Sequence, residues 1–139
     1  MKFSAKPYLD RVKVCTIGYG CTYYLDGKKV KLTDKPLTKA QASELQLAVI
    51  NRDFAPKIVT SLDGQVKSHF VTQTMFDACV SLAYNIGMAN FSGSSVIKYI
   101  KVNNKTKAAD SFLLWKMAQG EVLQGLINRR SAERKVFLS

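Results

Sequence analysis

The sequence has 139 residues, enough for one domain with a sizeable hydrophobic core. Its 21 Lys and Arg residues outnumber its 10 Asp and Glu residues, and the resulting net charge of +11 favours polyanionic partners over a merely solubilising surface. The sequence predicts neither a membrane helix, because no apolar run approaches the ~20 residues that one needs, nor a signal peptide at its start.

The cysteines argue against both a disulfide framework and a metal site. There are three of them, Cys15, Cys21 and Cys79, with no CxxC pair, and the chain has a single histidine. We therefore expect free thiols in a reducing compartment, with no metal and no cofactor.

Residues 1–35 are expected to form a small region of strands and turns. Residues 14–19 are rich in β-branched and aromatic side chains, which favours a strand. The Asp26-Gly27 pair predicts a hairpin turn. Asp10 lies in the approach to the strand, so its carboxylate could point into a cleft beside Thr16. The alternative is a hairpin capped by polar groups and without chemistry.

Helical patterns begin after residue 36. Thr38 and Gln41 match a capping box, and Pro56 predicts a break, so residues 36–56 form a connecting helix. Residues 61–64 indicate a turn. His69 has no partner pattern beside it and is interpreted as a surface or packing residue rather than a catalytic base.

Further helices follow Thr72. The first, capped by Thr72, is expected to end at Gly87, and Tyr84 and Asn85 near its end could line a sugar cleft, although core packing and capping explain them equally well. Three more helices are predicted over about 96–100, 107–117 and 126–138. In the last of them Arg129, Arg130 and Glu133 are helix neighbours, worth only a few tenths of a kcal/mol per exposed pair. The fold class is therefore α+β, a small β region followed by five or more helices.

Three segments resemble the phage-type lysozymes, the endolysins that cut bacterial cell-wall glycan. They follow the family's order over nearly the whole chain. The segments are Lys6-Pro7-Tyr8-Leu9-Asp10 followed by Thr16-Ile17-Gly18-Tyr19-Gly20; Phe76-Asp77-Ala78 with Ala83-Tyr84-Asn85-Ile86-Gly87; and Gly125-Leu126 with Arg129-Arg130 and Glu133.

The resemblance implies a single lysozyme-like domain over 1–139, with a small β region (1–35), a connecting helix (36–56), a larger helical lobe (57–139) and a cleft between the lobes. It implies hydrolysis of the β-1,4 glycan bonds of peptidoglycan during host cell lysis. The implied catalytic residues are Asp10, the family's second carboxylate, and Thr16, its water-positioning hydroxyl; the implied substrate-binding residues are Tyr19, Tyr84 and Asn85. We expect a monomer that binds peptidoglycan and no specific nucleic acid, accumulates in the host cytoplasm and reaches the wall after membrane permeabilisation.

One position departs from the family. Aligning the sequence on Tyr8-Leu9-Asp10 puts Met1 where the family has its general-acid glutamate and Lys2 at the following glycine, so the chain starts inside the family's first helix. Cys21 replaces the histidine that often follows the second glycine. We therefore expect impaired hydrolysis. The alternatives are an inactive lysozyme-like protein that binds peptidoglycan and, more remotely, a basic protein that binds nucleic acid, for which charge is the only support.

Overall fold

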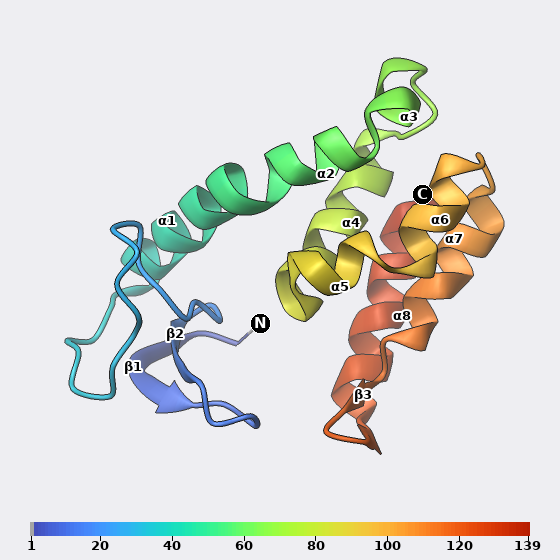
Figure 1. Ribbon diagram of the computed structural model, residues 1–139. Coiled ribbons are helices and arrows are strands. Elements are labelled where there is room, and N and C mark those ends of the chain that lie inside the picture. Colours follow the sequence, from blue (N-terminus) through green and yellow to red (C-terminus); the bar gives the residue numbers. More distant parts are fainter. Residues whose placement is uncertain (1) are drawn as a thin grey trace. The chain divides into compact units, whose positions relative to one another are not determined.

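The computed structural model describes residues 2–139, and Met1 lies outside the described residues. The chain divides into two compact units, Met1–Arg52 and Asp53–Ser139. The first holds a pair of strands and an α-helix, and the second holds the helices from Ala55 onward and a second small hairpin (Figure 1). The fold class is α+β, as the sequence predicts.

An antiparallel hairpin organises the first unit. The strand β1 (Ser4–Leu9) pairs with β2 (Cys15–Gly18) in a register that sets Tyr8 opposite Thr16, and the register shifts between Ser4 and Tyr8. The predicted strand is therefore confirmed, with its end at Gly18. The turn at Asp26-Gly27 is confirmed too, but the residues beside it form only an isolated bridge, between Tyr23 and Lys29.

The helix α1 (Lys39–Val49) begins at the predicted capping box. The hydroxyl of Thr38 accepts a hydrogen bond from the Gln41 N–H, and the Gln41 side chain accepts one from the Thr38 N–H. This helix lies close to β2: a Cβ at Gly18, where φ is +65°, would be 3.0 Å from the Ala42 Cβ. Glycine at position 18 therefore satisfies both the backbone conformation and the close approach.

The predicted break at Pro56 takes the form of a change in helix type. A π-helix (Ile50–Phe54) follows α1, and α2 (Ala55–Ser61) begins after it with Pro56 in its first turn, where no backbone N–H is needed. The boundary between the two compact units falls within the π-helix.

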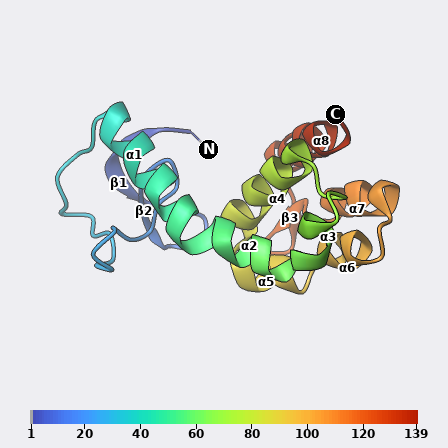
Figure 2. The same ribbon diagram turned by 90° about the horizontal axis from the view of Figure 1, so that it is seen from above.

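The second unit is a helical assembly around a single core. Its further elements, drawn from green to red in Figures 1 and 2, are α3 (Asp63–Lys67), α4 (Gln73–Ile86), α5 (Met88–Ser92), α6 (Ser95–Lys101), α7 (Lys105–Ser111), a 3-10 helix (Phe112–Leu114), β3 (Met117–Ala118), β4 (Glu121–Val122) and α8 (Gln124–Leu138). The most extensive packing is that of α4 on α8. Side chains from α2 to α8 form the core, among them Ile58, Leu82, Phe91, Phe112 and Phe137.

The central helix α4 has the predicted ends. The Thr72 hydroxyl accepts a hydrogen bond from the Met75 N–H at 3.2 Å. Gly87 ends the helix with φ +91°, a conformation that side chains rarely adopt. Cys79 and Ala83 are fully buried, as their helical spacing predicts.

Two predictions for the second unit are wrong. The turn expected at residues 61–64 is the junction of two helices, and Asp63 and Gly64 begin α3. The helix expected over 107–117 is α7, which ends at Ser111, followed by the 3-10 helix, while Met117 already belongs to β3. Gln119 and Gly120 both have positive φ, which suits the two-residue turn between β3 and β4 and prevents a helix there.

No helix among residues 2–139 combines the length and apolar character that crossing a membrane requires.

Candidate functional site

Asp10 and Thr16 share one anchor in the first unit, the peptide groups of Val14. The Asp10 carboxylate oxygen Oδ1 accepts hydrogen bonds from the N–H groups of Val12 (3.0 Å) and Val14 (2.8 Å). The Thr16 hydroxyl donates to the Val14 carbonyl at 3.0 Å. Among residues 2–139, Oδ2 of Asp10 has no hydrogen-bond partner, so one carboxylate oxygen holds the turn and the other is available.

The two side chains differ in exposure. Asp10 is half-buried, whereas Thr16 is only 3% exposed. A carboxylate that accepts two backbone N–H bonds has a fixed orientation without any ionic partner. The arrangement is therefore suited to holding a negative charge at a set position beside a polar hydroxyl.

Tyr19 is the third predicted site residue in the first unit. It lies between Gly18 and Gly20, both of which have positive φ, and is half-buried. Its ring packs on that of Phe3, with 5.5 Å between centroids. The ring therefore belongs to a small aromatic cluster next to the hairpin.

Tyr84 and Asn85 lie in the second unit, in the last turn of α4. The Tyr84 ring packs 5.4 Å from that of Phe54, and both residues are half-buried. The Asn85 side-chain oxygen accepts a hydrogen bond from Nη1 of Arg130 at 2.9 Å. The structure thus brings these two together at one helix end, and groups Asp10, Thr16 and Tyr19 in the other unit.

Sequence reasoning missed the environment of Arg130 and Glu133. The expected exposed pair is buried, with Arg130 at 0% and Glu133 at 5% exposure, and Arg130 Nε lies 2.6 Å from Glu133 Oε1. Ser81 of α4 also donates a hydrogen bond to Glu133. Spacing could have revealed this, because Arg130, Glu133 and the core residue Phe137 recur at i, i+3 and i+7.

Burial affects ionisation around this cluster. Desolvation lowers the pKa of Arg130, and the neighbouring Glu133 carboxylate opposes that shift. Burial, with a smaller contribution from the Glu133 charge, raises the pKa of the Cys79 thiol well above its usual range. Cys79 is therefore a buried neutral thiol rather than a nucleophile.

A polar clasp stabilises the loop of the first unit. The Tyr24 hydroxyl and the Lys31 N–H both donate to Oδ2 of Asp34 at 2.8 Å. Burial and this hydrogen bond raise the pKa of Tyr24 to about 12. The Lys31 N–H, followed by the Tyr24 hydroxyl, holds the pKa of Asp34 below its ordinary value.

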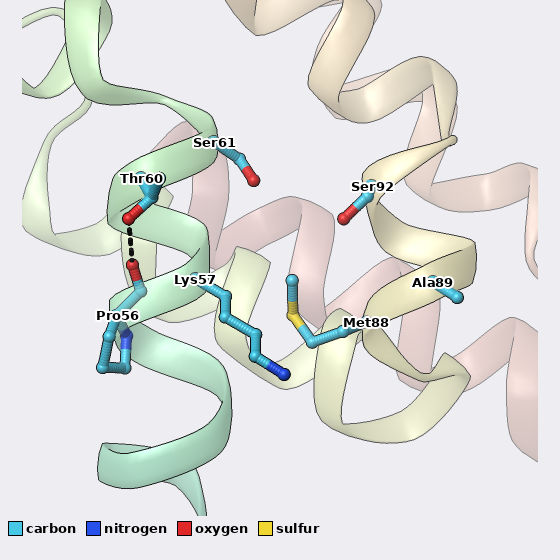
Figure 3. Close-up of a pocket in the computed structure, with 7 residues that line it drawn as sticks. All are labelled: Pro56, Lys57, Thr60, Ser61, Met88, Ala89 and Ser92. Atoms are coloured by element: carbon cyan, nitrogen blue, oxygen red, sulfur yellow. Dashed lines mark hydrogen bonds between the residues drawn. The ribbon is translucent and has the colours of Figure 1, made fainter.

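A surface hollow of about 440 Å³ lies between α2 and α5 (Figure 3). The Lys57 amine and the Met88 side chain point toward each other across it, and the Thr60 hydroxyl is turned back to the Pro56 carbonyl. Its lining contains no carboxylate and none of the predicted site residues. The lining residues are Pro56, Lys57, Thr60, Ser61, Met88, Ala89 and Ser92. The hollow therefore offers no acid–base pair.

Within residues 2–139, no group of three or more His, Cys, Asp or Glu side chains is placed to hold a metal ion. The three cysteines are free thiols, with Cys15 half-buried and the other two buried.

Comparison with known proteins gives one consistent result. The sequence model of the phage lysozyme family matches residues 2–133. The endolysin of Salmonella phage P22 is 35% identical over 134 residues, which cover 96% of this chain and 86% of that protein. The endolysin of Bacillus phage B103 is 39% identical over 97 residues, 70% of this chain.

A solved structure agrees. The endolysin from Escherichia coli O157:H7 phage FAHEc1 superposes with a TM-score of 0.77 at 31% identity, covering 99% of this chain and 85% of that one. The chain spans less than half the length of the Bacillus phage endolysins that it matches, 36% and 44%.

Proposed function

The chain belongs to the phage lysozyme family, and from this membership we propose that it hydrolyses the β-1,4 glycan bonds of bacterial peptidoglycan during host cell lysis. The observation that carries the proposal is the family match over residues 2–133. The α+β fold and its likeness to a phage endolysin structure support it. In this proposal the chain works as a single lysozyme-like domain and a monomer.

Asp10 and Thr16 are proposed to act on the water and the sugar cation. Glycoside hydrolysis uses one carboxylic acid to protonate the leaving oxygen and one carboxylate to assist water or stabilise the positive charge on the sugar. Asp10 suits the second role, because backbone N–H bonds to Oδ1 fix its carboxylate and leave Oδ2 available. Thr16, anchored on the same Val14, would orient the water.

Tyr19, Tyr84 and Asn85 are proposed to bind the glycan. The two tyrosines present aromatic rings, which can stack on sugar faces, and Asn85 presents an amide. The net charge of +11 favours approach to an anionic wall polymer. The site of action is proposed to be the cell wall, reached from the host cytoplasm after the membrane is permeabilised.

The 139-residue polypeptide is proposed to be impaired in this reaction. Met1 stands at the position that the resemblance assigns to the family's general-acid glutamate. A general acid contributes about 10²–10⁴-fold to such a rate. The same observation favours the second candidate function, binding of peptidoglycan without hydrolysis.

Two assays test the proposal. The polypeptide should sediment with purified insoluble peptidoglycan, and an excess of duplex DNA should not displace it. Release of reducing sugar ends from the same material then separates hydrolysis from binding. Complete displacement by DNA, with no new reducing ends, would instead support a nucleic-acid-binding protein and remove the proposed substrate.

A further inference from the structure

The guanidinium of Arg130 is fully enclosed within the second unit, where it contacts α4, its own helix α8 and the backbone of Trp115. Nη1 donates to Oδ1 of Asn85 on α4 at 2.9 Å and lies 3.5 Å from the carbonyl oxygen of Trp115. Nη2 donates to Oε2 of Glu133, its neighbour on α8, at 3.1 Å. Arg130 is 0% exposed, so no water competes for these donors.

The chemistry of this contact fixes the orientation of the Asn85 amide. A guanidinium has donors only, so the Asn85 oxygen must face Arg130 and its NH₂ group must point elsewhere. Among residues 2–139, that NH₂ group has no acceptor. Asn85 is half-buried at the end of α4. The oxygen, with its second lone pair, is turned toward Arg130, so the group that Asn85 directs elsewhere is its NH₂ donor.

Glu133 holds Arg130 in place. Its carboxylate pairs with Nε of Arg130 at 2.6 Å, lies 3.4 Å from Nε of Arg129, and accepts a hydrogen bond from Ser81. Ser81 and Asn85 are four residues apart and so lie on the same face of α4. The network thus contacts α4 at Ser81 and at Asn85, which prevents the Asn85 amide from flipping.

Stability alone does not account for these buried charges. Well-packed apolar side chains commonly stabilise a helix interface as well as a buried ion pair or better, because removing two charges from water is unfavourable. Arg130 does something that an apolar residue cannot: it fixes the orientation of the side-chain amide of Asn85, a half-buried residue of the proposed substrate site.

We infer that Arg130, held by Glu133, is a positioning residue that makes Asn85 a selective donor to a carbonyl oxygen of the glycan, such as that of an acetamido group. The inference rests on the proposed function and deepens it. A carbonyl oxygen accepts but cannot donate, so the site distinguishes it from a group that must donate. A glycan hydroxyl, by contrast, can accept a hydrogen bond from an amide or donate one to a carboxylate. Replacing the Asn85 amide with a carboxylate therefore distinguishes a carbonyl partner from a hydroxyl partner.

Asn85→Asp separates the two roles of this side chain. The aspartate retains an oxygen acceptor for Arg130 but has no NH₂ group. We expect a midpoint of thermal unfolding no lower than that of the parent, and binding of an N-acetylglucosamine oligosaccharide and of insoluble peptidoglycan weakened about tenfold, the loss of one well-formed hydrogen bond. Asn128→Asp is the matched control: it adds the same charge and retains the acceptor for Gln124, at an exposed position of α8.

A second pair of variants tests the positioning role. In Arg130→Lys, one ammonium replaces the planar fork and cannot serve Asn85 and Glu133 together. We expect the NMR signals of the Asn85 side-chain amide to shift, because its oxygen loses the fixed guanidinium donor, and we expect oligosaccharide binding to weaken. Arg134→Lys, at a partly exposed ion pair with Asp110, should change neither.

Unchanged oligosaccharide binding by Asn85→Asp would overturn the inference, as would weakening equal to that of Asn128→Asp. If Asn85→Asp does not fold, the same question is put to the unsubstituted protein by NMR. Adding the oligosaccharide should shift the signals of the Asn85 side-chain amide. An absence of this shift in a sample that binds the oligosaccharide would contradict the inference. A parent that binds neither oligosaccharide nor peptidoglycan contradicts the proposed function itself, so the two failures are distinguishable.

Discussion

The Asp10 turn and the Arg130 cluster position polar groups in opposite ways. Asp10 is half-buried and is held by N–H groups two and four residues away. Arg130 is fully buried and is held across 45 residues of sequence by Asn85, while its partner Glu133 is held across 52 by Ser81. The first arrangement needs only a local turn, whereas the second needs two packed helices. Removing a side chain should therefore affect chemistry at the turn and stability at the cluster.

The largest stability effect is expected from Arg130→Met. This substitution leaves the Glu133 carboxylate buried without its main partner, and breaking a buried pair in this way costs about 3–5 kcal/mol. Urea unfolding should show the loss. Arg134→Met, on the same helix, breaks a pair whose side chains are 36% and 55% exposed, and should cost about 1 kcal/mol or less. Equal losses of unfolding free energy in Arg130→Met and Arg134→Met would show that burial does not determine the cost of breaking the ion pair.

Asp10→Asn should show the reverse behaviour. Asparagine retains an oxygen for the Val12 and Val14 N–H groups, so the free energy of unfolding should change by less than about 1 kcal/mol. Activity in a form that carries the first-helix glutamate should fall on the order of 10²-fold, about 2.7 kcal/mol of barrier, because the charge proposed to assist the water is lost. Reducing-end assays on peptidoglycan measure this. An unaltered rate would remove Asp10 from the proposed chemistry.

Gly18→Ala tests the support beneath the hairpin. Its positive φ and the 3.0 Å approach to Ala42 should together make the substitution cost about 1–3 kcal/mol. Gly27→Ala is the control, since φ there is +85° but no atom lies within 4 Å of an added Cβ. Thermal unfolding should show a greater loss of stability for Gly18→Ala than for Gly27→Ala. The opposite order would mean that the close approach to α1 contributes little to the cost of the substitution.

The smallest effect concerns pH. Asp34 has a lowered pKa, so its contribution to stability is present above the ordinary value of 3.8 and is lost as pH falls through the lower folded-state pKa. Tyr24→Phe removes one of its two donors and should raise the pKa of Asp34 part of the way toward 3.8, as followed by NMR titration. Tyr8→Phe should not change it. Tyr24 itself, with its pKa raised to about 12, contributes below pH 10 and loses that contribution as pH rises.

Local signals in the sequence predicted the local structures well. The capping box at Thr38, the cap at Thr72, the end of α4 at Gly87 and the strand before Gly18 all depend on residues within a few positions of one another. The β3–β4 hairpin escaped prediction because the helical pattern was extended to Met117, the first residue of β3, whereas α7 already ends at Ser111.

In the candidate site, too, the local arrangement could be predicted from the sequence and the long-range contact could not. The residues around Asp10 and Thr16 could be singled out from their short spacing, and the structure adds their common anchor on Val14. The contact between Asn85 and Arg130 could not be, because no local pattern reports which side chain of a distant helix faces α4. Only the shared spacing of Arg130, Glu133 and Phe137 hinted that the charged pair lies on the buried face of α8.

The most direct test compares reducing-end release from purified peptidoglycan by two polypeptides. One is the 139-residue chain, and the other carries Met1→Glu behind an added first helical turn. We expect the form that carries Met1→Glu to be faster by about 10²–10⁴-fold, the usual contribution of a general acid. Equal and substantial rates for both would contradict this expectation, because another residue would then have to supply the proton. No activity in the form that carries Met1→Glu would show that the residue at position 1 does not limit the proposed reaction.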